Sequence, residues 1–371
     1  MKCARVRPWA SPGAARALSS VLVVSATVSL AAATGCGAQE PARAASAQAG
    51  VGVSTPKTYW AKIQAARPGD VIVLGDGDYG TLDLNGKSFA EPGIRIEAKP
   101  GAKAVFNSLS FQGSEGIEVR GMEVAVPSNA YGVNVQHSSR IRLSGLNIHA
   151  LGAELPNAAM LRDSHDLSLT DSDIHEVGTG VNFLESNHVK ISGNRFTNVQ
   201  SDAIRGAGSY IEVVGNSGSS FHPAEGDHPD FIQFWGSSTG VATGNVIKDN
   251  VFERGAGAVV QGIFIENNEN IAITGNAMAG TMYNGISLSG IKGALIADNF
   301  VQGYTDMGTR IIVRGASADV TIRDNVAESI VNLESEGQNP RYKEVHNTSI
   351  RPAKPGDTAA MKAWIAQHKA H

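Results

Sequence analysis

Two stretches of this chain share one pattern: GVNFLESNHVKISGNRF at residues 180–196 and GIFIENNENIAITGNAM at residues 262–278. Aligned on their first glycine, they match at the apolar positions and at a Gly-Asn pair. Such a pair, Gly-Asn or Asp-Asn, recurs along the chain at Gly193-Asn194, Gly215-Asn216, Gly244-Asn245, Gly275-Asn276, Asp298-Asn299 and Asp324-Asn325. From about Val71 the chain therefore divides into units of roughly 22 to 30 residues, a period typical of solenoids.

Short alternating strands in each unit predict a parallel coil, in which every strand pairs with its equivalent one turn later. Valine, isoleucine, leucine and phenylalanine would stack inward, while asparagine tolerates the left-handed corner and its amide can bond along the stack. Because each turn buries its apolar face only against neighbouring turns, the ends need caps. We expect a capping helix over residues 58–67 and a second amphipathic helix over 357–368, with Met361, Trp364 and Ile365 on one face.

Composition excludes several classes of protein. The 371 residues include 42 glycines, and only 6% are aromatic. Basic and acidic residues number 31 and 35, a net charge of −4, which argues against a nucleic-acid partner. Since 42% of the residues are hydrophobic, the chain can build a core and is not a disordered charged polymer.

Residues 1–36 have the pattern of an export signal. A basic start is followed by a small-residue apolar run over 17–34, and the segment ends with Ala33-Thr34-Gly35-Cys36. This ending resembles a bacterial lipobox, although Ala33 stands where leucine is usual. We expect lipidation of Cys36 and a membrane tether through that lipid, with ordinary cleavage nearby as the alternative. The predicted location is outside the cytoplasm, as an outer-membrane lipoprotein or in the periplasm.

The remainder divides into three predicted parts. Residues 37–54, rich in alanine, glycine, glutamine and serine, read as a flexible linker. Residues 55–335 form the β-helix domain, and residues 336–371 form a C-terminal extension with a capping helix. The only cysteine besides Cys36 is Cys3, which would leave with the signal, so the mature chain has no pair of cysteines for a disulfide. We expect a monomer.

The opening turn carries a resemblance to known enzymes. Residues 65–74 read AARPGDVIVL and are followed by DGDY at 76–79. This stretch is similar to the first turn of right-handed parallel β-helix enzymes that act on polysaccharides, among them the alginate lyase and chondroitinase B family and the mannuronan epimerases. The resemblance implies an all-β, right-handed parallel β-helix. The Asn-Lys-Ser signature of the lyases and the Asp-Pro-His-(Glu/Asp) element of the epimerases do not occur here.

Two consecutive turns are longer than the rest and predict where a site lies. Regular turns take about nine residues from the corner asparagine to the next strand, whereas Asn216 to Phe231 takes fifteen and Asn245 to Gly262 takes seventeen. Since successive turns stack, both excursions should emerge side by side and form the wall of a groove. Loops that leave a regular scaffold are common places for function.

The first excursion carries the candidate catalytic residues. His228, between Asp227 and Asp230, is a candidate general base or acid whose charge the carboxylates would tune. Gln233 and Trp235 would offer an amide and a stacking ring to a sugar. The alternative is that Asp-His-Pro-Asp is a rigid turn whose side chains cap their own backbone.

Neighbouring turns supply further candidates. Arg205 can bind a uronic carboxylate, or it can form a surface salt bridge with Asp202. Tyr283 could deliver a proton, although a tyrosine at the start of a strand is often a packing residue. The other candidate substrate contacts are His222, Lys248, Arg254 and Glu266, with a solvated surface role as the alternative for the two cations.

The first functional hypothesis is a polysaccharide lyase that cleaves a uronate-containing glycan by β-elimination. Arg205 and Gln233 would neutralise the sugar carboxylate, His228 would take the proton and Tyr283 would be the acid. The alternatives are a uronate epimerase, a glycoside hydrolase that uses Asp227 and Asp230, and a non-catalytic glycan-binding surface lipoprotein. No metal-ligand spacing occurs; calcium held by carboxylate oxygens, as in several lyases of this fold, is a possible cofactor.

Overall fold

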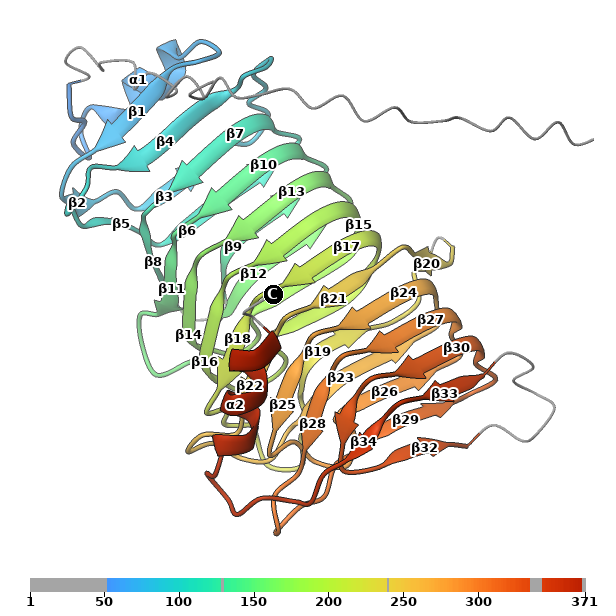
Figure 1. Cartoon of the computed structure of the whole chain (residues 1–371). Helices are drawn as coiled ribbons and strands as arrows, with labels where there is room; N and C mark the ends of the chain where they lie inside the picture. The colour runs from blue at the N-terminus through green and yellow to red at the C-terminus, as the bar shows by residue number, and fades with distance from the viewer. Residues whose placement is uncertain (1–51, 128–129, 239, 334–341, 369–371) are drawn as a thin grey trace, which may run out of the picture. The chain divides into compact units, whose positions relative to one another are not determined.

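The computed structural model describes residues 52–371 apart from 128–129, 239, 334–341 and 369–371 (Figure 1). The predicted signal, its Cys36 and nearly all of the predicted linker lie outside the described residues. The linker prediction is wrong at its last residue, because Ser54 is buried and already pairs with Leu74 of the first strand. The ordered body therefore begins before residue 55.

The body is a right-handed parallel coil of about 11 turns, which confirms the predicted fold (Figure 1). In the described residues its strands form two sheets, of 22 and 12 strands. The larger sheet contains β1 (Val71–Leu74), β3 (Thr81–Asp83), β4 (Ile94–Ala98), β6 (Ser108–Gln112), β7 (Glu115–Arg120), β9 (Tyr131–Gln136), β10 (Ser139–Ser144), β12 (Asn157–Arg162), β13 (His165–Thr170), β15 (Val181–Ser192), β17 (Ile204–Val214), β19 (Asp230–Phe234), β20 (Ala242–Thr243), β21 (Val246–Lys248), β23 (Gln261–Glu266), β24 (Asn268–Thr274), β26 (Ile286–Ser289), β27 (Lys292–Ala297), β29 (Ile311–Arg314), β30 (Ala318–Arg323), β32 (Ile330–Asn332) and β33 (Lys343–Val345). The smaller sheet contains β2 (Gly77–Asp78), β5 (Ala104–Phe106), β8 (Glu123–Val126), β11 (Asn147–Ala150), β14 (Asp173–Val177), β16 (Arg195–Val199), β18 (Ser217–Ser219), β22 (Val251–Glu253), β25 (Ala277–Ala279), β28 (Phe300–Gln302), β31 (Val326–Ala327) and β34 (Thr348–Ser349).

Parallel pairing stacks equivalent residues of successive turns in the core. Ile204 pairs with Ile232, which pairs with Ile263, and the series continues through Ile286 to Ile311. All five are fully buried. β-Branched side chains suit such a column because they pack well on a pleated surface.

Five of the six recurring asparagines form a ladder at one corner of the coil, together with Asn250 and Asn347, which confirms that their amides bond along the stack. The prediction is wrong for Asn245, which is not a member: its Nδ2 donates to Asn268 Oδ1 at 2.7 Å. We call the series Asn194, Asn216, Asn250, Asn276, Asn299, Asn325 and Asn347 the asparagine ladder. Each Nδ2 donates to the next Oδ1 at 2.9 to 3.0 Å. One detail of the prediction is wrong: the left-handed residue is the one before each asparagine, such as Gly275 with φ +68°.

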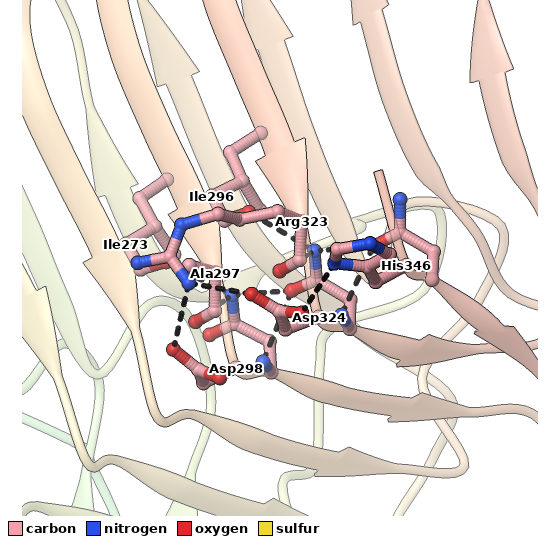
Figure 2. A network of polar contacts seen from close by, with 10 residues as sticks. Ile273, Ile296, Ala297, Asp298, Arg323, Asp324 and His346 are labelled. Atoms are coloured by element: carbon pink, nitrogen blue, oxygen red, sulfur yellow. Dashed lines mark hydrogen bonds and ion pairs between the residues drawn. The ribbon is translucent and has the colours of Figure 1, made fainter. Parts of the chain in front are cut away.

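Charged side chains flank the lower part of this corner (Figure 2). Arg323 Nη1 lies 2.5 Å from Asp324 Oδ2 and 3.8 Å from Asp298 Oδ2, while His346 Nδ1 lies 3.5 Å from Asp324 Oδ1. Asp298 and Asp324 are the left-handed residues of successive turns, so Arg323 lies within reach of both carboxylates. These side chains are half-buried or exposed, and ion pairs open to solvent add little stability each.

The two helices have different places in the body. α1 (Tyr59–Ala65) packs against β1 and buries Tyr59 and Ile63 in the core, so it caps the first turn as predicted. α2 (Ala359–His368) buries Met361 and Trp364. Contrary to the prediction, α2 does not close the end of the coil: it packs on the flank, against β25 and β28 (Figure 1).

The coil itself continues past the predicted boundary at residue 335. β33 pairs with β30 and β34 pairs with β31, so the parallel pairing reaches Ser349. In the described part of the chain no helix has both the length and the apolar character to cross a membrane.

Candidate active site

The two connections predicted to be overlong lie next to each other, as expected from their order in the chain, but only the first is a long loop: residues 254–260 are no longer than the connection 303–310 before β29. One loop, residues 220–229, follows β18, and the other, residues 254–260, follows β22. The Ala258 N–H donates to the Phe221 carbonyl at 2.9 Å. A Cβ on Gly257 would lie only 2.4 Å from the backbone nitrogen of Phe221, so the second loop can pass this closely because it has glycine there. We call these segments the first and second loops.

The second loop is shorter than the sequence count suggests, and this moves two candidate residues. Lys248 is not in a loop: it ends β21, where its Nζ lies 3.6 Å from Asp249 Oδ2. Arg254 begins the loop but is 7% exposed, because its guanidinium binds both carboxylate oxygens of Asp306 at 2.8 and 2.9 Å. It also lies 4.6 Å from the ring centre of Tyr304. These contacts with Asp306 and Tyr304 bury the Arg254 side chain within the packing of the loops.

A row of buried polar side chains begins the strands beside these loops. Asp230 pairs with Gln261 in the strand register, and the Asp230 N–H donates to Asp202 Oδ1 at 2.7 Å. Asn284 donates its side-chain amide to Gln261 Oε1. All four are at most 6% exposed. We call Asp202, Asp230, Gln261 and Asn284 the carboxyl row.

A second polar row lies three residues further along the same strands. Asn182, Arg205 and Gln233 are register partners on β15, β17 and β19. Arg205 Nε donates to Asn182 Oδ1 at 2.6 Å, and its Nη1 donates to Asp202 Oδ2 at 3.1 Å. The arginine therefore joins this row to the carboxyl row. Its nearness to Gln233 follows from the parallel register of β17 and β19, and Asp202, which it contacts, precedes β17.

Burial changes the acidity of the two aspartates. The pKa of Asp230 is raised well above its ordinary value, first by burial and then by the carboxylates of Asp202, Asp227 and Glu266. The pKa of Asp202 is also raised, chiefly by burial, although the Asp230 N–H and the Arg205 guanidinium favour its charged form. A carboxyl group with a raised pKa keeps its proton to a higher pH than an exposed one and can donate it.

Several buried polar atoms around these rows lack a hydrogen-bond partner in the described structure. They are Asn182 Nδ2, Asp230 Oδ1, Asn284 Oδ1 and Ser287 Oγ. Buried polar atoms are nearly always paired, because an unpaired one costs about 1–3 kcal/mol. A cluster of unpaired atoms around a buried acid is therefore typical of a binding site rather than of a structural core.

The Asp-His-Pro-Asp segment is in part the turn that the alternative interpretation describes. Asp227 Oδ1 accepts the backbone N–H of His228 at 2.8 Å, and the His228 carbonyl accepts from Gln261 Nε2 at 3.3 Å. The His228 ring is exposed on the first loop. Asp230, at the end of the segment, is the member that enters the buried cluster.

The remaining candidate residues lie around the cluster at different depths. His222 is exposed on the first loop, with its N–H on the Val199 carbonyl. Trp235 directly follows β19 and is half-buried, and Glu266 ends β23. Tyr283 is 46% exposed in the connection before β26. Of these four residues, Glu266 is the one whose carboxylate helps to raise the pKa of Asp230.

Sequence reasoning missed Gln261 and Asn284 and treated Asp202 only as a partner of Arg205. A repeated four-residue pattern would have identified them. DAIR at 202–205, DFIQ at 230–233, QGIF at 261–264 and NGIS at 284–287 all place a polar residue two positions before the stacked isoleucine. Stacking of the isoleucines then requires stacking of the polar residues. Among the described residues, no group of three or more His, Cys, Asp or Glu side chains is placed to hold a metal ion.

Comparison with solved structures shows the same fold at low sequence identity. A mannuronic acid specific polysaccharide family 6 lyase from human gut microbiota matches at TM-score 0.55 and 17% identity, over 81% of this chain and 82% of that one. The catalytic unit of a GH87 alpha-1,3-glucanase from Streptomyces thermodiastaticus matches at TM-score 0.54 and 14% identity, over 84% and 71%. A GH136 lacto-N-biosidase from Eubacterium ramulus matches at TM-score 0.51 and 12% identity, over 77% and 63%.

At sequence level, a search of curated proteins finds no match. The sequence model described as the right handed beta helix region matches residues 72–301, which is more than half of the chain. This chain therefore belongs to the right-handed β-helix family.

Proposed function

We propose that this protein hydrolyses glycosidic bonds in a glycan, with Asp230 as the general acid. The observation that carries the proposal is a buried carboxyl group with a strongly raised pKa and an unpartnered oxygen. Hydrolysis of a glycoside needs such an acid to protonate the leaving oxygen, together with a second carboxylate as base or nucleophile. The three solved structures named above are each described as acting on a saccharide, which supports a glycan as substrate.

Asp227 is the proposed second carboxylate. It lies on the first loop, open to water, and close enough to Asp230 to raise the pKa of that group. Asp202 has a supporting role, because its oxygens already bind Arg205 and the Asp230 backbone. Gln233 and Gln261 would offer amides to sugar hydroxyls beside the acid.

Access to Asp230 requires a movement of the first loop. Asp230 is only 2% exposed, and Pro229 before it is also buried, while residues 224–228 are exposed to solvent. We infer that the glycan displaces this segment and that its hydroxyls then meet the unpartnered atoms of the cluster. Loops that close over a site and exclude water are common in enzymes.

A screen of the full-length protein on neutral and uronate polysaccharides tests the proposal. Hydrolysis releases reducing ends without absorbance from unsaturated uronates. The Asp230→Asn variant should then lose about 10²- to 10⁴-fold in rate, the usual contribution of a general acid. Asp163→Asn is the matched control, because Asp163 is an exposed carboxylate with φ +47°, a conformation that asparagine tolerates. Full activity in Asp230→Asn would contradict the proposal.

A polysaccharide lyase is the second candidate, favoured by the pairing of Arg205 with Gln233 next to the exposed ring of His228. In that mechanism His228 would take the sugar proton and Tyr283 would protonate the leaving oxygen. The exposed carboxylate of Asp227 disfavours it, since a uronate bound there would meet like charge. Products with unsaturated-uronate absorbance would select the lyase over the hydrolase.

A further inference from the structure

A second outgrowth of the coil lies at the opposite end of β19 from the first loop. Residues 235–241 connect β19 to β20 and leave the regular coil beside β20 (Figure 1). In the other turns from β6 to β30 the equivalent connection has at most three residues, and β15 and β17 run through this corner without a break. We call residues 235–241 the outer connection. β19 is therefore flanked by an outgrowth at each end.

One glutamate from two turns earlier holds the outer connection. Glu185 Oε1 accepts the Ser238 N–H at 2.8 Å and the Ser238 hydroxyl at 2.7 Å. Its Oε2 accepts the Ser237 hydroxyl at 2.5 Å. Hydrogen bonds to a carboxylate are stronger than those between neutral groups. Both oxygens of one side chain thus bind two adjacent residues of the outer connection.

The backbone of β15 aims Glu185 toward this connection. The register between β15 and β17 shifts between Leu184 and Ser186, and Glu185 between them has φ +50°. Such a bulge turns a side chain out of the regular ladder. On the intervening turn the register partners of Leu184 and Ser186 are Ala207 and Gly208. These small residues leave room for the glutamate side chain to pass across β17.

Backbone contacts fix the start of the outer connection as well. The Trp235 N–H donates to the Gly206 carbonyl at 3.1 Å. A Cβ on Gly236 would lie 2.9 Å from Asn267 Cβ, so the connection passes close to the following turn at a position where it has glycine. Trp235 therefore lies between contacts with the turn before and the turn after.

The Trp235 side chain belongs to the outer face of the larger sheet. Ile232 and Phe234 are buried, so the alternation along β19 places Trp235 on the opposite face, where it is half-buried. Phe264 on the following turn has its ring covered by Arg314, whose guanidinium lies 5.4 Å from the ring centre. Aromatic rings beside a few polar groups are usual in ligand sites. Trp235 is the better placed of the two rings to contact a sugar.

We propose that Glu185 is a positioning residue that holds Trp235 against one sugar unit of a bound glycan. The inference rests on the proposed function for the class of its ligand. Trp235 follows the proposed acid Asp230 by five residues, which span roughly 16 Å of strand. A glycan of several sugar units can therefore meet both residues. Glu185 binds the outer connection and not the sugar, so it acts on affinity and not on the chemical step.

Binding to variants that also carry Asp230→Asn tests the inference without turnover. The probes are hexasaccharides of glucose, mannose, galactose, xylose or a uronate, titrated calorimetrically into the full-length protein. We expect at least one to bind, and Trp235→Leu and Glu185→Ala each to weaken that binding about tenfold. Because both changes act through the same ring, the double variant should bind no more weakly than either single variant. Glu185→Gln keeps an acceptor for Ser238 and should restore the affinity of the parent.

Glu176→Ala is the matched control, because Glu176 is an exposed glutamate with φ +54° on the smaller sheet. It places alanine in the same left-handed conformation as Glu185→Ala does. Additive losses in the double variant would overturn the inference, as would unchanged affinity in either single variant or binding of none of the hexasaccharides. The hydrolase is tested separately. Trp235-dependent binding by a wild-type protein that releases no reducing ends would support the role of Glu185 and Trp235 and contradict the hydrolase.

Discussion

The asparagine ladder and the carboxyl row are two buried polar columns in one coil, and they differ in how fully their atoms are paired. In the ladder, Asn276 Nδ2 donates to the next asparagine and to backbone carbonyls, and its Oδ1 accepts from Asn250. In the carboxyl row, Asp230 Oδ1 and Asn284 Oδ1 have no partner in the described structure. The comparison teaches that burial alone does not identify a site. Single unpaired buried atoms also occur elsewhere, such as Ser144 Oγ and Gln302 Oε1, and the carboxyl row differs in placing them beside a buried acid with a raised pKa.

The largest effect on stability is expected from breaking the ladder. In Asn276→Ala the N–H and amide of Asn250 lose their acceptor, and the Ile247 carbonyl loses its donor. Since each buried unpaired group costs about 1–3 kcal/mol, we expect a loss of about 3 kcal/mol in the free energy of unfolding. Urea denaturation of the variant and wild type measures it. An unchanged midpoint would mean that the ladder is not a structural element.

Replacing Asp230 in the carboxyl row should raise the free energy of unfolding, whereas breaking the ladder lowers it. Asp230→Asn replaces a group that is costly to ionise in the interior with a neutral one of the same shape. We expect the free energy of unfolding at pH 7 to rise by about 1 kcal/mol while activity is lost. Thermal denaturation at fixed pH checks this, with Asp163→Asn as the exposed control. A loss of stability as large as that of Asn276→Ala would remove the distinction between the two columns.

The pH dependence of stability sharpens the same distinction. Because the pKa of Asp230 is raised in the folded protein, the folded state holds a proton that the unfolded state releases near pH 4. Stability therefore falls as the pH rises from about 4 toward the folded pKa, and Asp202, whose pKa is also raised, contributes in the same direction. Urea midpoints at pH 4, 5.5 and 7 should fall more steeply in wild type than in Asp230→Asn. Parallel curves would show that Asp230 titrates normally.

The fold could be predicted from sequence because one pattern repeats. The spacing of Gly193-Asn194 and Gly275-Asn276 fixes both the period and the stacking of the corner, so local chemistry determines the topology. The first excursion could be located in the same way, since a loop is whatever exceeds the period. Asn250 was missed because Gly244-Asn245, five residues earlier, was taken as the corner, and Asp249-Asn250 then fell in the segment counted as a loop.

The site was harder to predict because burial and pairing are not local properties. The emphasis on His228 came from the residue type, yet its ring is exposed and Asp230 is the buried member of that segment. Arg254 looked like a free cation until the structure placed Asp306 against it from a turn two further along. Which polar side chains remain unpaired depends on contacts between turns, and a single turn of sequence does not contain that information.

The smallest expected effect comes from the last member of the ladder. Asn347 repeats two kinds of bond that Asn276 makes: its Oδ1 accepts from Asn325 at 3.0 Å, and its Nδ2 donates to the Ile322 carbonyl at 3.0 Å. Asn276 also donates to Asn299 Oδ1 and to the Thr274 carbonyl. It is only half-buried, however, so water can replace the amide in Asn347→Ala. We expect a loss of about 0.5 kcal/mol in the free energy of unfolding, measured in urea beside Asn276→Ala. Because Asn347 is the less buried residue and makes fewer donor bonds, the contrast measures how far burial and full pairing together set the cost of breaking the ladder. Equal losses in the two variants would show that the bonds themselves, and not their burial, carry the stability of the ladder.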